Sequence, residues 1–388
     1  MINNNFPPAL TPPMGWNSFN TFGCSPSEKL IKETADAIVA TGLRDAGYIY
    51  VNIDDGWMLK DRDKDGNLIV NPEMFPNGFN ELTEYVHNLG LKIGIYLGCG
   101  LRTYNEKAGS LGHEYKDARQ IAEWGFDFLK YDNRHIKDED PPRNTKLEYI
   151  TMAKALRESG REILFSMCEH GATKPWLWAQ GVGHMWRITT DIRNMWDGAM
   201  SGAWGFNLIV DERAEIHPYA RTCGWNDPDM LVTGMYKANN WMGPGCTDIE
   251  YRSHFSLWCL MAAPLIIGCD VRKINEITLR TLTNPQMIAV NQDILGIQGR
   301  RVSSVRGIDI WFKPLHDLSW AVGLYNRTCV PANISVKWED LNLPAEMDAT
   351  VTDLWSGEEL GVFTEKFTSK VESHECMVVK LRPTTISV

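Results

Sequence analysis

The stretch Gly125-Phe-Asp-Phe-Leu-Lys-Tyr-Asp-Asn133 contains the three signals that decide the fold. A glycine opens it, a short apolar run follows, and polar residues with carboxylate and amide side chains close it. Glycine readily adopts the positive φ with which many helices end. The order therefore predicts the end of a helix, then a buried strand, then functional residues at the end of that strand.

The same order recurs along the first half of the chain. Gly47, Gly90 and Gly160 also precede short apolar runs, over 48–54, 91–96 and 161–168, and the four glycines lie 35 to 43 residues apart. That spacing fits one strand–helix unit. Further strands are expected near 14–16, 185–191, 223–229 and 264–271. Eight such units over roughly 290 residues predict an α/β fold of the (β/α)₈ TIM-barrel type, with an open doubly wound sheet as the alternative.

The pattern changes after about Asn291. Segments 308–312, 319–325 and 377–381 are short, alternate between apolar and polar residues, and are separated by turn residues. They predict a C-terminal antiparallel β-sandwich. We therefore expect a catalytic barrel over residues 1–297 and a sandwich domain over 298–388.

Composition narrows the class of protein. The 388 residues are 44% hydrophobic and 23% charged, with a net charge of −10, which disfavours nucleic acid or an anionic membrane as a partner. The chain start lacks a signal-peptide pattern, and no apolar run could span a bilayer. Nine cysteines without C-x-x-C spacing suggest thiols in a reducing, cytoplasmic compartment. The sequence leaves the oligomeric state open, a homo-oligomer included.

Polar clusters fall at the ends of five expected strands, at 52–55, 130–133, 168–170, 187–191 and 226–229. In a barrel these ends meet at one mouth, where active sites are built. Each Asp could instead cap the following helix. Two of the clusters, at 52–55 and 226–229, hold two acids each, which a single cap does not explain.

Two carboxylates of these clusters suit glycoside hydrolysis. Lys130 and Asp132 lie two apart on a strand and face the same side, so the lysine charge would keep Asp132 ionised, as a nucleophile requires. Asp191 follows an apolar run that would desolvate it and raise its pKa, as a general acid requires. Such a pair supports a retaining mechanism, for which we expect no metal and no cofactor.

Longer motifs resemble a known family. Met14-Gly-Trp-Asn-Ser-Phe-Asn, Asn52-Ile-Asp-Asp-Gly-Trp, Phe128-Leu-Lys-Tyr-Asp-Asn and Gly224-Trp-Asn-Asp-Pro-Asp-Met-Leu are similar to motifs of glycoside hydrolase family 27. That family holds the α-galactosidases and α-N-acetylgalactosaminidases, and the resemblance covers nearly the whole chain.

The resemblance implies roles for individual residues. Asp132 matches the family nucleophile and Asp191 its acid/base. Asp54, Asp55 and Lys130 match residues that bind sugar hydroxyls, and Glu169 matches the position that meets the 2-hydroxyl in galactosidases. Trp16 and Trp57 are expected to wall the pocket. The remaining substrate-binding positions are Tyr96, Cys168, Arg187, Asp229 and Met230.

Departures from the family bear on the sugar and the compartment. His170 stands where relatives usually carry Trp, and Gly56 stands where secreted relatives carry a Cys that would pair with Cys24. An acidic residue at Glu169 leaves little room for an N-acetyl group, so a terminal α-galactoside is the favoured substrate. The alternatives are an α-N-acetylgalactosaminidase, a β-L-arabinopyranosidase or, from another class, a non-catalytic glycan-binding protein.

Overall fold

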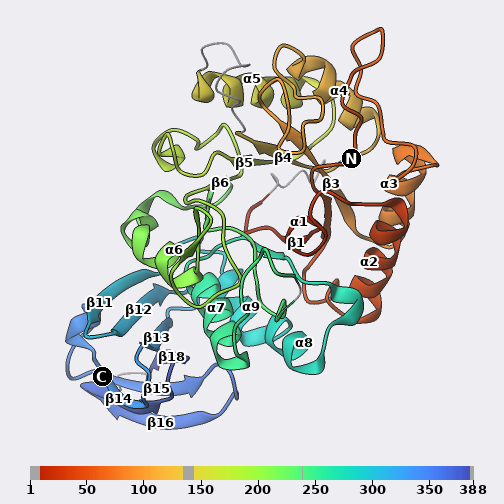
Figure 1. Ribbon diagram of the computed structural model, residues 1–388. Coiled ribbons are helices and arrows are strands. Elements are labelled where there is room, and N and C mark those ends of the chain that lie inside the picture. The colour runs from red at the N-terminus through yellow and green to blue at the C-terminus, as the bar shows by residue number, and fades with distance from the viewer. Residues whose placement is uncertain (1–8, 134–143, 238, 385–388) are drawn as a thin grey trace, which may run out of the picture.

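The computed structural model describes residues 9–133, 144–237 and 239–384. Along these residues a parallel barrel wrapped in helices is followed by a smaller antiparallel domain, drawn in blue beneath α6 and α7 (Figure 1). The barrel strands follow one another in space as in sequence, except that the last strand returns beside the first. They are β1 (Met14–Asn17), β2 (Tyr50–Ile53), β3 (Lys92–Gly98), β4 (Phe128–Asp132), β5 (Leu164–Cys168), β6 (Met185–Arg187), β9 (Trp225–Asp227) and β10 (Leu265–Ile267).

The sheet is closed, not open. Neighbouring strands pair in parallel, β10 pairs with β1, and a bridge between Leu231 and Ile267 joins the end that follows β9 to β10. The prediction of a barrel over an open sheet is thus confirmed. Gly47, Gly90, Gly125 and Gly160 all have positive φ, as predicted for the residues that precede β2 to β5.

Helices surround the barrel and bury their apolar stripes against it. In α2, for example, Leu30, Ile31 and Ile38 are buried. Its N-cap is Ser27, whose side chain accepts a hydrogen bond from the Leu30 amide. The helices are α1 (Phe19–Phe22), α2 (Glu28–Ala40), α3 (Gly78–Asn88), α4 (Glu114–Glu123), α5 (Thr145–Glu158), α6 (Phe206–Glu212), α7 (Asp248–Leu260), α8 (Glu276–Leu282) and α9 (Pro285–Asn291). Short 3₁₀ turns lie at η1 (Pro175–Leu177), η2 (Ala214–Tyr219), η3 (Val271–Lys273) and η4 (Glu339–Leu341), and β7 (Ala199–Met200) and β8 (Ala203–Trp204) form a small hairpin.

The C-terminal domain is antiparallel, as predicted. One sheet has the order β11-β12-β13-β18-β15-β16, and β14 pairs with β17 in a second sheet. Val322, Leu324, Val336, Trp338 and Val379 belong to its own apolar core. The strands are β11 (Arg300–Val305), β12 (Ile308–Pro314), β13 (Trp320–Asn326), β14 (Ala332–Lys337), β15 (Asp348–Asp353), β16 (Glu359–Thr364), β17 (Lys366–Val371) and β18 (Cys376–Pro383).

Polar and aromatic contacts attach this domain to the barrel. Ser253 of α7 donates its hydroxyl to the His374 carbonyl, 2.7 Å away, and accepts the Cys376 amide at 2.7 Å. The His374 ring stacks on Trp196 with ring centres 4.1 Å apart. Trp196 belongs to the loop that carries Asp191, so the sandwich supports one wall of the barrel mouth from behind.

Candidate active site

A cavity of about 670 Å³ opens at the carboxyl ends of the barrel strands. It brings together ten of the thirteen site residues predicted from sequence: Asp54, Asp55, Tyr96, Lys130, Asp132, Cys168, Arg187, Asp191, Asp229 and Met230. It is also lined by eight residues that were not assigned to the site from sequence: Phe19, Asn20, Tyr104, Asn133, His170, Ile192, Arg193 and Trp241. The additional residues all lie beyond strand ends, where strand patterns give no signal.

Asp132 is the last residue of β4 and is held on both carboxylate oxygens. The Tyr96 hydroxyl donates to Oδ2 at 2.7 Å, and His170 Nε2 lies 3.2 Å from Oδ1. Burial alone would raise the pKa of Asp132, but His170, Lys130 and Tyr96 together lower it to about 2. The carboxylate is therefore ionised at neutral pH, as expected from sequence, although the nearest cationic partner is His170 and not Lys130.

Lys130 and Asp54 form a second, deeper pair. Lys130 Nζ donates to Asp54 Oδ2 at 2.8 Å, and Asn17 Nδ2 donates to the same oxygen at 2.8 Å. Asp55 next to it accepts the Asn105 amide at 2.7 Å. Burial and the Asp54 charge raise the pKa of Asp55 to about 6. The floor of the cavity thus offers a charged amine and two fixed carboxyl groups to hydroxyl groups of a ligand.

Asp191 lies four residues beyond the end of β6, on a loop and not at a strand end. Its Oδ1 is 3.1 Å from Arg187 Nη2 and 3.5 Å from His170 Nδ1. Burial favours the neutral acid, but the positive charges of Arg187 and His170 outweigh it and hold the pKa of Asp191 below its usual value. The expectation of a raised pKa in the free protein was wrong because the apolar run brings Arg187 alongside.

His170 joins the two carboxylates through one imidazole ring, Nε2 facing Asp132 and Nδ1 facing Asp191. Burial would lower its pKa, but the nearby Cys168 and Asp132 raise it well above the ordinary value. Its backbone has φ of 60°, which non-glycine residues seldom adopt and which points to a constrained position. The sequence showed His170 as a departure from the family but did not assign it to the site.

Trp16, Trp57 and Glu169, the other three residues expected from sequence, are not among the residues that line the cavity. Trp16 and Trp57 are fully buried, and their indole nitrogens donate at 2.8 Å to the carbonyls of Cys269 and Tyr96. Glu169 is fully buried too, with Oε2 accepting from the Thr173 amide and hydroxyl. All three side chains therefore lie in the protein interior.

The aromatic surface at the mouth comes from loops instead. Phe19, Tyr104 and Trp241, the aromatic rim, pack edge to face, with ring centres 6.1 Å apart for Phe19–Tyr104 and 5.5 Å for Phe19–Trp241. Tyr104 is 61% and Trp241 40% exposed. Exposed rings beside a polar cavity offer a flat surface for the apolar face of a sugar.

Arg187 also binds Asp229, with Nη2 3.0 Å from Oδ2. The Ile192 amide donates to the same oxygen at 2.8 Å, which fixes the start of the loop that holds Asp191. Asp227 lies beneath this pair and accepts the Asp229 amide at 2.9 Å. Its burial raises its pKa to about 6.

Replacing Asp227 should change the pH dependence of stability. A carboxyl group with a raised folded-state pKa stabilises the fold below its unfolded pKa, and that stability is lost as pH rises through about 6. Asp227→Asn keeps an oxygen for the Asp229 amide but cannot ionise. We expect its free energy of unfolding to exceed that of the wild type at pH 7 by up to about 3 kcal/mol, and to match it at pH 4. Denaturant titrations at the two pH values measure this, and an equal difference at both would contradict the assignment.

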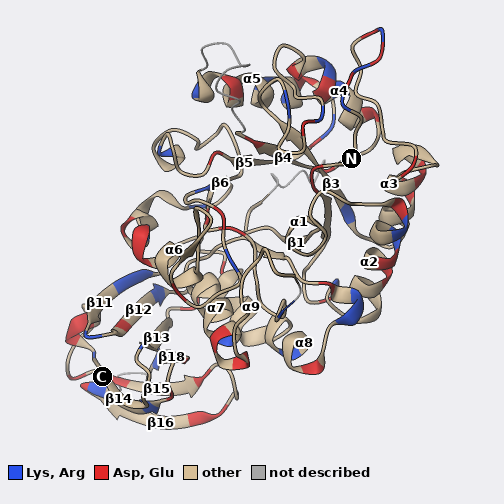
Figure 2. Ribbon diagram, viewed as in Figure 1, with Lys and Arg blue, Asp and Glu red and all other residues tan. Residues whose placement is uncertain are grey.

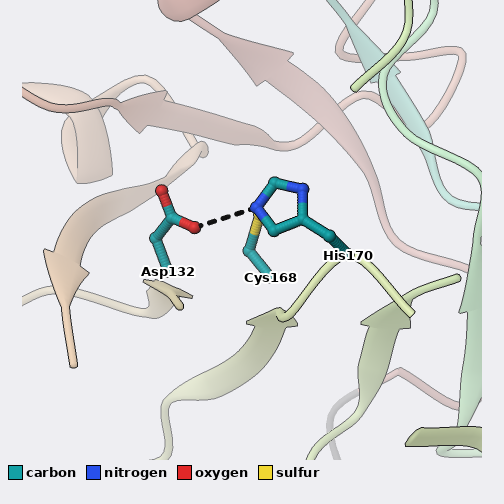
Figure 3. A group of neighbouring side chains, drawn as sticks. All are labelled: Asp132, Cys168 and His170. Atoms are coloured by element: carbon teal, nitrogen blue, oxygen red, sulfur yellow. Dashed lines mark hydrogen bonds and ion pairs between the residues drawn. The ribbon is translucent and has the colours of Figure 1, made fainter. Parts of the chain in front are cut away.

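One cluster of side chains in the cavity has the donor atoms of a metal site. Among the described residues, Asp132, Cys168 and His170 place one donor atom each within 4.8 Å of one another (Figure 3). All three residues line the cavity described above, and one of them, Asp132, is the predicted nucleophile. The arrangement as a whole offers two ionised carboxylates that share one imidazole, above a floor of charged hydrogen-bonding groups.

Comparison with known proteins gives matches over both domains. The family model described as "Alpha galactosidase A" matches residues 11–293, and that of the "Alpha galactosidase C-terminal beta sandwich domain" matches 305–381. An alpha-galactosidase of Cyamopsis tetragonoloba is 42% identical over 374 residues, which cover 96% of this chain and 86% of that protein. Alpha-galactosidase A of Cellvibrio japonicus is 40% identical over 389 residues, covering 97% and 93%. The crystal structure of alpha-galactosidase I from Mortierella vinacea superposes with a TM-score of 0.90 at 34% identity and covers 100% of both chains.

Proposed function

The chain belongs to the alpha-galactosidase A family of glycoside hydrolases, and we propose that it removes terminal α-linked galactose from galactosides with net retention of configuration. The observation that carries the mechanism is Asp132, an ionised carboxylate held on both oxygens at the strand end that faces the cavity. Retaining glycosidases use such a group to attack the anomeric carbon and form a covalent glycosyl-enzyme. No metal or cofactor takes part in these steps.

Asp191 is the proposed acid/base. It protonates the leaving oxygen in the first step and takes a proton from water in the second. In the free protein it is held ionised by Arg187 and His170. A bound sugar placed between Asp191 and these cations would weaken their hold and raise its pKa, so the acid form would arise together with the substrate complex.

Asp54, Asp55 and Lys130 are proposed to bind the axial 4-hydroxyl and the 6-hydroxyl of galactose. Fixed donors and acceptors that match these groups reject glucose, because its equatorial 4-hydroxyl would leave buried polar atoms unpaired. The 2-hydroxyl adjoins the carbon attacked by Asp132. Beside Asp132 the cavity is lined by Cys168 and His170, whereas Glu169 is not among its lining residues. We assign to these two residues the restriction of room for an N-acetyl group.

Initial rates on three aryl glycosides test the proposed substrate. We expect the α-galactoside to be hydrolysed much faster than the α-N-acetylgalactosaminide and the β-L-arabinopyranoside. Proton NMR of the first-formed sugar should show α-galactose. If β-galactose formed first, net retention of configuration would be contradicted. Turnover of another sugar alone would overturn the substrate. Binding of galactose without turnover of any glycoside would favour a non-catalytic glycan-binding protein.

The aromatic rim is proposed to hold the part of the substrate beyond galactose. Trp241→Ala should raise KM for a galactosyl oligosaccharide by about five- to tenfold, because a lost stacking contact costs about 1 kcal/mol. KM for methyl α-galactoside, which has no second ring, should stay the same. Trp241→Phe is the matched control and keeps most of the affinity. An equal rise in KM for both substrates would place Trp241 at the galactose itself.

Compartment, domains and partners complete the proposal. None of the nine cysteines, all of which lie among the described residues, forms a disulfide, which supports a reducing, cytoplasmic location. An unchanged melting temperature with and without reductant is the expected result. No helix of the described ranges is long and apolar enough to cross a membrane. Acidic and basic residues are interspersed on the outer helices (Figure 2), which supports the absence of a nucleic-acid or membrane partner. Whether the protein forms a homo-oligomer can be tested by size-exclusion chromatography. We assign residues 1–297 to the catalytic barrel and 298–388 to the sandwich.

A further inference from the structure

We propose that Asp132, Cys168 and His170 form a binding site for a borderline or thiophilic divalent cation, with Zn²⁺ as the reference ion, and that this cation inhibits the enzyme. The site is the group of side chains drawn in Figure 3. Zinc is commonly bound by a carboxylate oxygen, a thiolate sulfur and an imidazole nitrogen together. Mg²⁺ and Ca²⁺ prefer oxygen ligands alone, so the donor set selects against them.

The distances fit a tetrahedral ion. His170 Nε2 lies 3.2 Å from Asp132 Oδ1 and 3.8 Å from Cys168 Sγ. Zinc bonds of about 2.0–2.1 Å to nitrogen and about 2.3 Å to sulfur, at tetrahedral angles, place such donor atoms about 3.3 to 3.6 Å apart. The third pair of donors, on Asp132 and Cys168, lies within 4.8 Å, so side-chain shifts of up to about an ångström would bring all three donors onto one ion.

The surroundings orient the ligands as metal sites require. With Nε2 on the ion, His170 Nδ1 faces Asp191 Oδ1 at 3.5 Å, the arrangement in which a carboxylate fixes a metal-bound imidazole. Arg187 Nη1 lies 3.6 Å from Cys168 Sγ, but burial and the Asp132 charge raise the pKa of this thiol, so the cation itself must displace the thiol proton. Lys130 and Arg187 would repel a dication, but Asp54, Asp191 and Asp229 line the same cavity and balance these charges.

The site keeps an open position. His170 is 33% and Asp132 14% exposed toward the cavity, so an ion can enter and a water molecule can serve as the fourth ligand. Binding replaces the thiol proton and the Nε2 proton, which pass to solvent. The bound cation occupies a lone pair of Asp132 that would otherwise attack the sugar. Inhibition, competitive with the galactoside, therefore rests on the proposed function, whereas binding of the cation does not.

Binding is measured directly on the full chain. Isothermal titration with Zn²⁺ should give one site, and titration with Co²⁺ should give a sulfur-to-cobalt charge-transfer absorption that reports Cys168. His170→Phe and Cys168→Ser should each weaken Zn²⁺ binding by about 100-fold or more, and Cys168→Ser should also abolish the absorption. Cys329→Ser removes an exposed cysteine of the sandwich domain and is the matched control, with unchanged binding. Thermal melts of each variant confirm that it is folded.

The outcomes separate this inference from the proposed function. The proposed site is supported if Zn²⁺ binds the wild type, is displaced by galactose and fails to bind both pocket variants. This holds whether or not glycosides are turned over. Equal binding by the wild type and His170→Phe, or loss of binding in Cys329→Ser, would overturn it. If Zn²⁺ at about 100 µM left the turnover of α-galactosides unchanged, the proposed inhibition would be overturned, whereas the proposed hydrolase activity would stand.

Discussion

Asp132→Asn is expected to lower kcat on an aryl α-galactoside by on the order of 10⁴-fold or more, because the amide cannot form the glycosyl-enzyme. The substitution is nearly isosteric and keeps an oxygen for the Tyr96 hydroxyl, which donates to Asp132 Oδ2 at 2.7 Å. Binding of galactose should persist, so the loss appears in kcat and not in the dissociation constant. Steady-state rates and calorimetric titration with galactose measure the two quantities separately.

Tyr96→Phe is the matched control for Asp132. It removes the same 2.7 Å hydrogen bond but leaves the carboxylate, so kcat should fall by only about tenfold, the effect of one hydrogen bond. If the two variants lost activity equally, positioning and not nucleophilic attack would be the role of Asp132. If Asp132→Asn retained more than a few per cent of the activity, the nucleophile would have to be a different residue.

Asp191→Ala is expected to show the second-largest loss, and its size should depend on the leaving group. For an alkyl galactoside, whose leaving oxygen needs a proton, kcat/KM should fall by about 10²- to 10⁴-fold. For an aryl galactoside with an acidic phenol, the first step needs little assistance, and the fall should be smaller. Azide needs no general base and should restore turnover. It attacks the β-linked glycosyl-enzyme on Asp132 and should therefore give α-galactosyl azide.

Arg187→Lys tests the same assignment from its neighbour. Arg187 Nη2 lies 3.1 Å from Asp191 Oδ1, and a lysine would keep one charge but lose the second contact to Asp229. We expect a moderate loss that is independent of the leaving group and is not restored by azide. A leaving-group dependence in Arg187→Lys but not in Asp191→Ala would reverse the two roles.

The sequence predicted the barrel well because its signals are local. The glycines before β2 to β5 all adopt positive φ, and the apolar runs after them all form strands. The common location of the acids at the strand ends could be predicted without knowing the loop conformations, since the carboxyl ends of parallel barrel strands meet at one mouth. For that reason the strand pattern alone could place Asp54, Asp55, Asp132 and Asp229 in one cavity.

What escaped prediction depends on distant contacts. Whether a tryptophan faces the core or the mouth is decided by neighbours elsewhere in the chain, as the bond from Trp16 to the Cys269 carbonyl shows. The pKa of Asp191 depends on Arg187 and His170, which reach it from different elements. His170 itself carries a backbone conformation that residue type does not reveal.

The position of the aromatic rim allows substrate preference and bond-breaking chemistry to evolve separately. Phe19, Tyr104 and Trp241 stand on three connections that follow β1, β3 and β9, whereas Asp132 and Lys130 belong to a strand of the barrel itself. Insertions or substitutions in those connections can alter the preference for what lies beyond the galactose without disturbing the paired backbone that holds the carboxylates. A lineage that carries this scaffold can thus acquire new natural substrates by mutating its loops while the bond-breaking chemistry is inherited unchanged.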